Sequence, residues 1–318
     1  MTWTKLVISF ALFIAVAVIF VHLRATAREQ AAEAAFPPDG QFVTIDGRRV
    51  HAVVTGTGPD LVLIHGSSGN TRDFTHSFVN YVSDRYRVII FDRPGLGWSD
   101  RLPVGAEGIH EQAAQLRKAA AALGANKPIV LGQSYGAAVA LAWALDAPQT
   151  LAAVVNVSGP SHPWDGPLPL IYRINAHPIG SALVVPLITA FVSVSRATAD
   201  LDTVFAPQAM PKGYVDYAAI PLTLKRSALR ANASQRASLN DEIKALAERY
   251  PDFPVPMEIV HGDADVTVSA SIHAAQMIEA TDMANLTLLP GIGHMPHHVA
   301  PREVADAIDR AALRARLR

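Results

Sequence analysis

Residues 130–137 read Val-Leu-Gly-Gln-Ser-Tyr-Gly-Ala, which contains the pattern Gly-x-Ser-x-Gly around Ser134. An apolar run at 128–131 precedes the pattern, and an alanine-rich run at 137–147 follows it. This order predicts a strand, a sharp turn and a helix, with Ser134 held in a strained conformation that lifts its hydroxyl clear of a sheet. The free N–H groups of the helix N-terminus would lie beneath it. The turn is a suitable place for a nucleophile, although taken alone it fits a surface turn with a helix-capping serine equally well.

The composition limits the classes of function. The chain has 318 residues, of which 50% are hydrophobic and 17% charged, which suits one large α/β domain with an insertion or two small domains. The net charge is -1 and no long basic run is present, so nucleic-acid binding has no support. The chain has no cysteine, which excludes disulfides, a cysteine nucleophile and thiolate metal sites.

Short apolar runs alternate with helical stretches along most of the chain. A hairpin is expected first, from 41–45 and 49–55 around the turn Asp46-Gly47. The later alternation predicts a mostly parallel sheet with helices on both faces, whose chemistry collects at the carboxyl ends of the strands. The later predicted strands are 61–64, 87–91, 129–131, 154–157, 257–260 and 286–289, and the predicted helices are 71–83, 109–123, 135–147, 269–280 and 302–316.

Residues 6–23 carry no Asp, Glu, Lys or Arg and stand between Lys5 and Arg24. As a helix they would rise about 27 Å, close to the ~30 Å hydrocarbon core of a bilayer. A cleaved signal peptide is the alternative, because Ala25-Thr26-Ala27 resembles a cleavage site and cleavage would make the protein secreted. The apolar stretch is longer than a usual signal core, which favours an uncleaved single-pass membrane anchor. The positive charges on its two sides do not decide the orientation; the folded domain is expected outside the cytoplasm because an N-terminal signal-anchor more often leaves the following domain there.

The alternation breaks after residue 158, where a proline-rich region begins that has helical pieces but no sheet strand. Because strands resume afterwards, this region is expected to be a helical cap over the strand ends rather than a separate domain. The predicted organisation is a transmembrane anchor at 1–24, a linker at 25–40, the first part of the α/β core at 41–159, the helical cap at 160–236 and the second part of the core at 237–318.

A serine nucleophile needs a base, a carboxylate to orient that base, and N–H donors for the oxyanion. The candidates occur in the order Ser134, Asp265, His294; nucleophile, acid and then histidine is the order expected of this architecture. His294 follows Gly291-Ile292-Gly293 directly after the last predicted strand. His297 and His298 are rivals for the base, but they lie further from the strand end.

The other catalytic candidates are less sharply defined. Asp265 stands three residues after Gly262, and Asp263 is its rival, with a loop-holding side-chain-to-backbone bond as its alternative role. No carboxylate follows the strand at 154–157 before residue 165, which supports Asp265. The expected oxyanion donors are the backbone N–H groups of Tyr135 and Ser67.

Taken together, these pieces resemble the α/β-hydrolase superfamily, in its cap-bearing branch of esterases, lipases, haloperoxidase-like enzymes and carbon–carbon bond hydrolases. The resemblance implies an eight-stranded sheet, a Ser-His-Asp triad, no cofactor and a structural role for Asp92 in a turn beside the pocket. Relatives that use an aspartate nucleophile have it where this chain has Ser134, which argues against dehalogenase or epoxide-hydrolase chemistry. The matching pieces are His65-Gly66, Asp92–Ser99 (DRPGLGWS), Gly132–Gly136 (GQSYG), the Gly262-x-x-Asp265 turn and Gly293-His294.

The expected function is hydrolysis of a carboxylic ester of a small or lipid-like apolar substrate, with no metal, cofactor, nucleic acid or obligate protein partner. A carbon–carbon bond hydrolase or a cofactor-free haloperoxidase or perhydrolase on the same residues is the alternative. An inactive membrane-tethered binding protein would be expected to lack one triad residue, and none is missing. Residues 174–195 carry no charge; they are expected to line an apolar pocket above Ser134, to face the bilayer, or simply to pack as a cap helix on the core.

Overall fold

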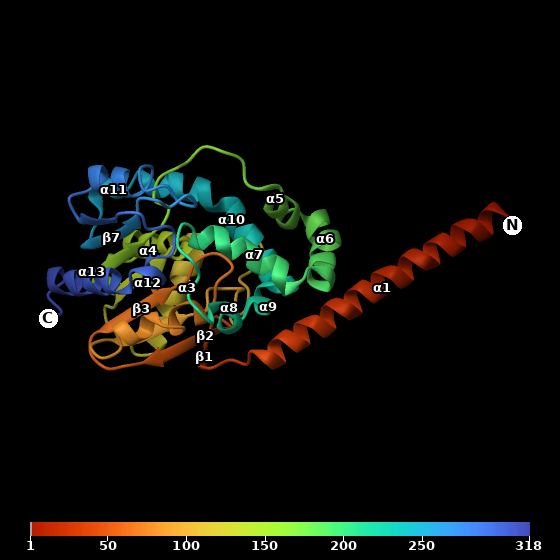
Figure 1. The fold of residues 1–318 in the computed structure, drawn as a ribbon, viewed down its shortest axis with the longest axis horizontal. Coiled ribbons are helices and arrows are strands. Elements are labelled where there is room, and N and C mark those ends of the chain that lie inside the picture. Colours follow the sequence, from red (N-terminus) through yellow and green to blue (C-terminus); the bar gives the residue numbers. More distant parts are fainter. Residues whose placement is uncertain (1) are drawn as a thin grey trace.

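The protein is represented by a computed structural model, in which the structure of residues 2–318 is described. Its centre is an eight-stranded sheet in the order β1-β2-β4-β3-β5-β6-β7-β8 (Figure 1). The pairs β1–β2 and β2–β4 are antiparallel and all other pairs are parallel, which confirms the expected mostly parallel sheet. The strands are β1 (Gln41–Ile45), β2 (Arg48–Thr55), β3 (Asp60–Ile64), β4 (Arg87–Phe91), β5 (Ile129–Gln133), β6 (Ala153–Val157), β7 (Met257–Gly262) and β8 (Ala284–Leu289).

Helices cover both faces of the sheet, so the central strands are buried on both sides and consist almost entirely of apolar residues. One face is covered by α3 (Ile109–Ala122), α4 (Tyr135–Asp146) and α11 (Ala274–Ala280), and the other by α2 (Arg72–Thr75), η1 (Phe78–Tyr81) and α13 (Pro301–Arg314). The short helices η2 (Pro148–Thr150), η3 (Tyr250–Asp252) and α12 (Pro296–Val299) complete this core.

Two expected helices differ from the observed ones. The predicted helix at 71–83 is split into α2 and η1, because Ser77 between them has φ -154° and leaves the helical region. The predicted helix at 269–280 begins only at Ala274. Residues 269–273 form a turn in which the amides of Ile272 and His273 bond to the carbonyl of Ser269.

The helical region between β6 and β7 covers the carboxyl ends of the strands (Figure 1). Its last helix continues past residue 236, where the sequence predicts the end of the cap. Leu239, Ile243 and Leu246 of that helix pack into the core below, so cap and core share one helix. The helices of the region are α5 (Leu170–Ala176), α6 (Pro178–Phe191), α7 (Val194–Phe205), α8 (Tyr214–Tyr217), α9 (Ile220–Thr223) and α10 (Arg226–Ala247).

The N-terminal helix α1 (Trp3–Ala35) runs without a break through the apolar span and on through most of the predicted linker. Its first part stands away from the domain (Figure 1), and it is long and apolar enough to cross a membrane. Its last part is docked on the cap: Ala25 and Ala32 are buried, and Glu29 pairs with Arg226 of α10 at 2.6 Å. The segment predicted as a linker is therefore helical up to Ala35 and held to the cap.

Candidate active site

Ser134 lies in the turn between β5 and α4. Its φ of 51° and ψ of -122° place it in a backbone region that residues with a side chain rarely adopt. The two flanking glycines make the turn possible. A Cβ on Gly132 would meet the backbone oxygen of Gly136, and a Cβ on Gly136 would meet the carbonyl of Ile64 in β3. The predicted strand, sharp turn and helix are thus present around Ser134.

Three side chains from separate segments form a continuous hydrogen-bonded line. The Nε2 atom of His294 lies 2.9 Å from the hydroxyl of Ser134, and its Nδ1 atom lies 2.7 Å from Oδ2 of Asp265. A carboxylate only accepts hydrogen bonds, so Nδ1 carries the proton and Nε2 is left to accept one from the serine. The structure therefore brings together the three residues that the sequence places in this role.

The carboxylate of Asp265 is fixed on all sides. Its Oδ1 accepts hydrogen bonds from the backbone N–H groups of Thr267 (2.8 Å) and Val268 (2.9 Å). Its Oδ2 lies 3.3 Å from Nε2 of His261, a residue that the sequence did not single out. Burial alone would raise the pKa of Asp265, but hydrogen bonds from His261 and His294 outweigh burial and hold the pKa well below its usual range. Asp265 is thus ionised and oriented toward the imidazole of His294.

The rivals considered from the sequence lie elsewhere. Asp263 is exposed, and its Oδ1 accepts a hydrogen bond from the backbone N–H of Gly291 at 2.6 Å. His297 and His298 point to a different carboxylate, that of Asp73. None of these three side chains hydrogen-bonds to Ser134 in the described part of the chain.

The loop after β3 lies opposite the turn that carries Ser134. His65 is buried within it; its Nε2 accepts from the backbone N–H of Arg93 at 3.0 Å, and its pKa is lowered to about 4, chiefly by burial and then by the charge of Arg93. The side chain of Asn232 in α10 bonds to both the N–H and the hydroxyl of Ser68, at 3.1 and 2.9 Å. Core and cap together therefore hold this loop beside Ser134.

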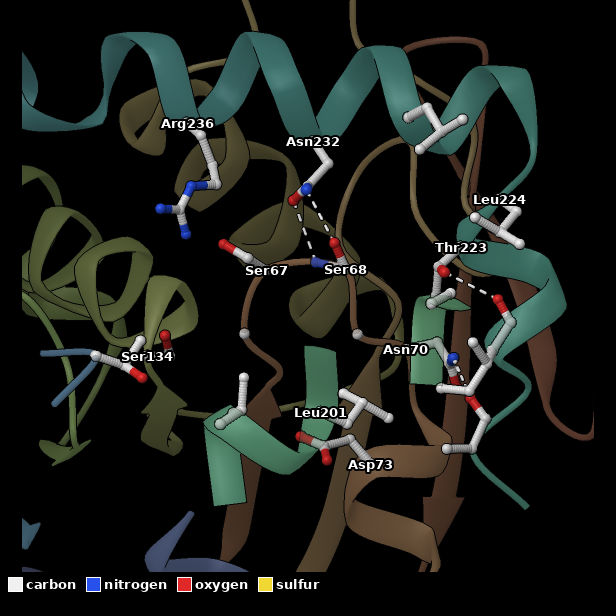
Figure 2. A pocket seen from close by; sticks show the side chains of 18 of the residues that line it. Ser67, Ser68, Asn70, Asp73, Ser134, Leu201, Thr223, Leu224, Asn232 and Arg236 are labelled. Carbon is white, nitrogen blue, oxygen red and sulfur yellow. Dashed lines mark hydrogen bonds between the residues drawn. The ribbon is translucent and has the colours of Figure 1, made fainter. Parts of the chain in front are cut away.

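The two predicted oxyanion donors come from this loop and from the helix. Ser67 borders the same cavity as Ser134, and Figure 2 shows the two serines on neighbouring segments of its wall. Tyr135 is the first residue of α4, so its backbone N–H has no partner within the helix. Both amides belong to segments that meet at the hydroxyl of Ser134.

A cavity of about 550 Å³ lies between the strand ends and the cap. Its floor is polar and contains Ser134 and His294, while the cap contributes mainly apolar side chains. Arg236 is an exception: its guanidinium lies 4.7 Å from the ring centroid of Tyr172, and the side chain is directed into the cavity near Ser67 (Figure 2). The apolar lining consists of Ile171, Ile188, Val192, Leu201, Val204 and Leu229, among others.

Asp92 begins the turn that the sequence identifies as DRPGLGWS. It is fully buried, and its carboxylate accepts from the backbone N–H groups of Thr71 (2.7 Å) and Trp98 (2.8 Å) and lies 2.8 Å from Nδ1 of His51. All of these partners belong to surrounding loops and strands rather than to the cavity. Asp92 therefore holds the turn beside the site, as the resemblance implies.

A second cluster of aspartate and histidine was not found from the sequence. Asp73 of α2 lies 2.9 Å from Nε2 of His298 and 3.2 Å from Nε2 of His297, and it accepts a 2.7 Å hydrogen bond from Tyr214. The ligand-type atoms of the three residues lie within 4.8 Å of one another, a spacing that suits a metal ion. In the structure each imidazole donates its Nε2 proton to the carboxylate, and a metal ion could bind there only by displacing these protons. As described, the cluster is a hydrogen-bonded unit.

Comparison with known proteins identifies the class. The sequence model of the alpha/beta hydrolase family matches residues 61–307. The pimeloyl-[acyl-carrier protein] methyl ester esterase of Nitrosomonas europaea is 27% identical, over 82% of this chain and 98% of its own length. This chain belongs to the alpha/beta hydrolase family and is a hydrolase.

Solved structures agree on the fold. A thermophilic esterase from Thermogutta terrifontis superposes with a TM-score of 0.71 and 21% identity, over 87% of this chain and 99% of its own. A structure described as a membrane phospholipase A, a bacterial virulence factor, superposes with a TM-score of 0.65 and 19% identity. That alignment covers 98% of this chain and 99% of the other, so the likeness extends to the N-terminal helix.

Proposed function

We propose that the protein hydrolyses carboxylic esters with Ser134 as nucleophile, His294 as general base and Asp265 as the residue that orients it. The observation that carries the proposal is the hydrogen-bonded line from Ser134 through His294 to Asp265, which starts at a strained serine and ends at a buried carboxylate. Because the hydroxyl of Ser134 also borders the cavity, a bound ester would meet it directly.

In the proposed reaction, Ser134 Oγ attacks the ester carbonyl carbon while Nε2 of His294 takes the hydroxyl proton. Asp265 keeps Nδ1 protonated and stabilises the imidazolium that forms. The backbone N–H groups of Ser67 and Tyr135 would bind the oxyanion. His294 then protonates the leaving alcohol, and a water molecule activated by the same imidazole attacks the acyl-enzyme and releases the acid.

The preferred substrate class is an ester with a small or lipid-like apolar acyl group. The apolar lining that the cap contributes to the cavity supports this class, because a mostly apolar pocket favours apolar groups. Both an esterase and a membrane phospholipase A occur among the structural neighbours, which is consistent with ester chemistry on this fold. Fold alone does not select the substrate.

We further propose that α1 is an uncleaved anchor that holds the domain on the outer side of a membrane. The residues that resemble a signal-peptide cleavage site lie inside a continuous helix, where Ala25 is fully buried against the cap. Full-length protein should stay with membranes after alkaline extraction, and a mature N-terminus near Arg28 would overturn the anchor.

A fluorophosphonate probe tests the chemistry directly, because it reacts with activated serine nucleophiles. The purified full chain should be labelled on Ser134, and it should hydrolyse p-nitrophenyl esters in a panel from acetate to decanoate. The Ser134→Ala variant should be neither labelled nor active. Labelling at Ser134 without turnover of any ester would retain the nucleophile and overturn ester hydrolysis.

A further inference from the structure

The outer face of the cap helix α6 is apolar along its whole length. Four side chains spaced four residues apart form one stripe on this face and are largely exposed: Ile179 (64%), Leu183 (64%), Leu187 (45%) and Phe191 (51%). The helix contains no charged residue at all. Large exposed apolar patches of this kind mark contacts with a partner or with a membrane.

Helix α13 provides the contrast within the same molecule. It has 14 residues, as α6 has, and it also begins with a proline. Its buried face carries Val304 and Ile308, and its outer face carries Arg302, Glu303 and Asp306. This is the pattern of a helix that faces water. α6 lacks the charged outer face of a helix that faces water, although its apolar stripe is exposed in the isolated chain.

The position of α6 identifies what covers the stripe. α6 packs against α1 where the apolar span of that helix ends: the Nε–H of Arg24 donates to the carbonyl of Ala190 at 2.9 Å, and the guanidinium lies 5.3 Å from the ring centroid of Phe191. The apolar part of α1 beyond this contact is unburied. α5 and α6 stand on the side of the domain from which this part of α1 projects (Figure 1). The apolar surface of α6 is thus continuous with that of the membrane-span helix.

We propose that α6 lies in the interfacial layer of the bilayer that α1 crosses, with the stripe Ile179, Leu183, Leu187 and Phe191 in contact with acyl chains. Interfacial helices bury an apolar face in this way without crossing the membrane. The 112° bend between α5 and α6 rules out a single straight second span built from the two. Arg230, which bonds through Nε–H to the Ser181 hydroxyl of α6 at 3.0 Å, brings a cation to the boundary where lipid phosphates lie.

The inner side of α6 borders the cavity of the candidate active site. Ile188 of α6 and Val192, the residue directly after the helix, line that cavity, whereas Leu183 and Leu187 do not. α6 is therefore a wall with lipid on its outer side and the Ser134 cavity on its inner side. If the proposed ester hydrolysis holds, this arrangement places the Ser134 cavity one helix away from the acyl chains of the bilayer.

The absence of cysteine from the chain allows a direct measurement on the full-length protein. Single cysteines replace Leu183 or Leu187 on the stripe, Ile14 in α1 as the lipid control, and Leu313, the exposed leucine of α13, as the water control. Each variant is labelled with a nitroxide and reconstituted into phosphatidylcholine–phosphatidylglycerol vesicles. Power saturation then compares collisions with oxygen, which partitions into lipid, and with a water-soluble nickel chelate.

Nitroxides at 14, 183 and 187 should favour oxygen by several-fold over the nickel chelate, and the one at 313 should favour the chelate. If the nitroxide at position 14 favours oxygen while those at 183 and 187 favour the chelate, as at 313, then α1 crosses the membrane but α6 does not contact lipid. If the nitroxide at position 14 also favours the chelate, both the membrane anchor and the membrane contact of α6 are wrong. Low collision with both reagents together with spin–spin broadening at 183 would instead place a second copy of the chain on the stripe. None of these readouts uses ester turnover, so they stay separate from the proposed chemistry.

Discussion

The molecule contains two buried clusters in which an aspartate meets a histidine of the segment after β8. In the first, Asp265 meets His294, and in the second, Asp73 meets His297 and His298. Both carboxylates have pKa values held below the usual range against the effect of burial. The residue types are the same, but only the first cluster includes a serine hydroxyl at a strained turn. An aspartate–histidine pair is therefore not evidence of catalysis unless its outer nitrogen faces a reactive group.

The surroundings explain why the two clusters differ. In the first, the imidazole stands between a fixed carboxylate and a hydroxyl that borders the cavity. In the second, the two rings pack against aromatic neighbours, with Phe74 5.1 Å from His297 and Phe205 5.4 Å from His298 between ring centroids. Tyr214 donates to Asp73, and both residues border the same cavity as Ser134. The imidazole of the first cluster lines that cavity, whereas His297 and His298 are not among its lining residues. The first cluster can therefore exchange a proton with a ligand, whereas the second ties α2, α8 and α12 together.

The largest effect should come from removing the hydroxyl that the second cluster lacks. Ser134→Ala should lower kcat for p-nitrophenyl butyrate by about 10⁶-fold, as measured for serine-triad nucleophiles. Ser67→Ala is the matched control, because Ser67 borders the same cavity but is expected to act only through its backbone N–H. It should change kcat by less than about tenfold. Equal losses in the two variants would contradict the assignment of Ser134.

The next effect separates the two aspartates of the loop after β7. Asp265→Asn should lower kcat by about 10⁴-fold, because an amide stabilises the wrong tautomer of His294. Asp263→Asn, at an exposed carboxylate that only holds the Gly291 amide, should leave kcat within about threefold of wild type and lower the melting temperature slightly. If Asp263→Asn lost the activity and Asp265→Asn kept it, the orienting acid would be wrong.

The first cluster could be predicted from the sequence because each member follows a strand in a fixed order. Gly-x-Ser-x-Gly gives Ser134, and the strand ends give Asp265 and His294. The second cluster has no such signal, because Asp73 belongs to a short helix and Tyr214 to the cap, and only the fold brings them together. His261 was missed for a related reason: it sits within a strand and acts through a carboxylate four residues later.

The outer regions of the chain were less predictable than the sheet. The strands can be predicted from short apolar runs in the sequence. The arrangement of the cap cannot, because it depends on contacts between segments that are far apart in the chain. Nothing local predicts that α10 continues past residue 236 or that residues 25–35 form a helix docked on the cap, because the contact of Glu29 with Arg226 joins residues far apart in the chain. The sequence shows that residues 174–195 carry no Asp, Glu, Lys or Arg. It does not show which of their side chains face the cavity, because that depends on the rotation of α6 about its own axis.

The second cluster should matter for stability far more than for chemistry. Asp73→Asn removes the charge and replaces one of the two acceptor oxygens, shared by His297, His298 and Tyr214, with an NH2 donor; it should lower the free energy of unfolding by about 3 kcal/mol, the usual scale for breaking a buried polar network. Urea denaturation measures this loss, and kcat of the folded variant should stay within about tenfold of wild type. A 10⁴-fold loss of kcat with an unchanged urea midpoint would mean that the second cluster takes part in the reaction.

The same variant should change how stability depends on pH. Burial would raise the pKa of Asp73, but the charges and hydrogen bonds of His297 and His298 outweigh it and hold the pKa well below its usual range. A depressed carboxyl pKa contributes stability that is fully present above the unfolded value of about 4 and is lost as the pH falls through the folded pKa. The difference in melting temperature between wild type and Asp73→Asn should therefore shrink as the pH falls below about 4. A difference that grew with acid would contradict an ionised Asp73.

The smallest effect should come from changing the shape of the cavity without changing any residue of the proposed chemistry. Leu201 of α7 packs on the apolar residues around Tyr214 and borders the cavity close to Asp73 (Figure 2). Leu201→Ala removes apolar contact area without touching Ser134 or His294, so it should raise KM for a p-nitrophenyl octanoate by roughly three- to tenfold, the scale of a few lost methylene contacts. KM for the acetate ester should stay within about twofold, because a short acyl chain does not extend to this wall. Equal increases for both esters would mean that Leu201 supports the fold of the cap instead of contacting the acyl chain.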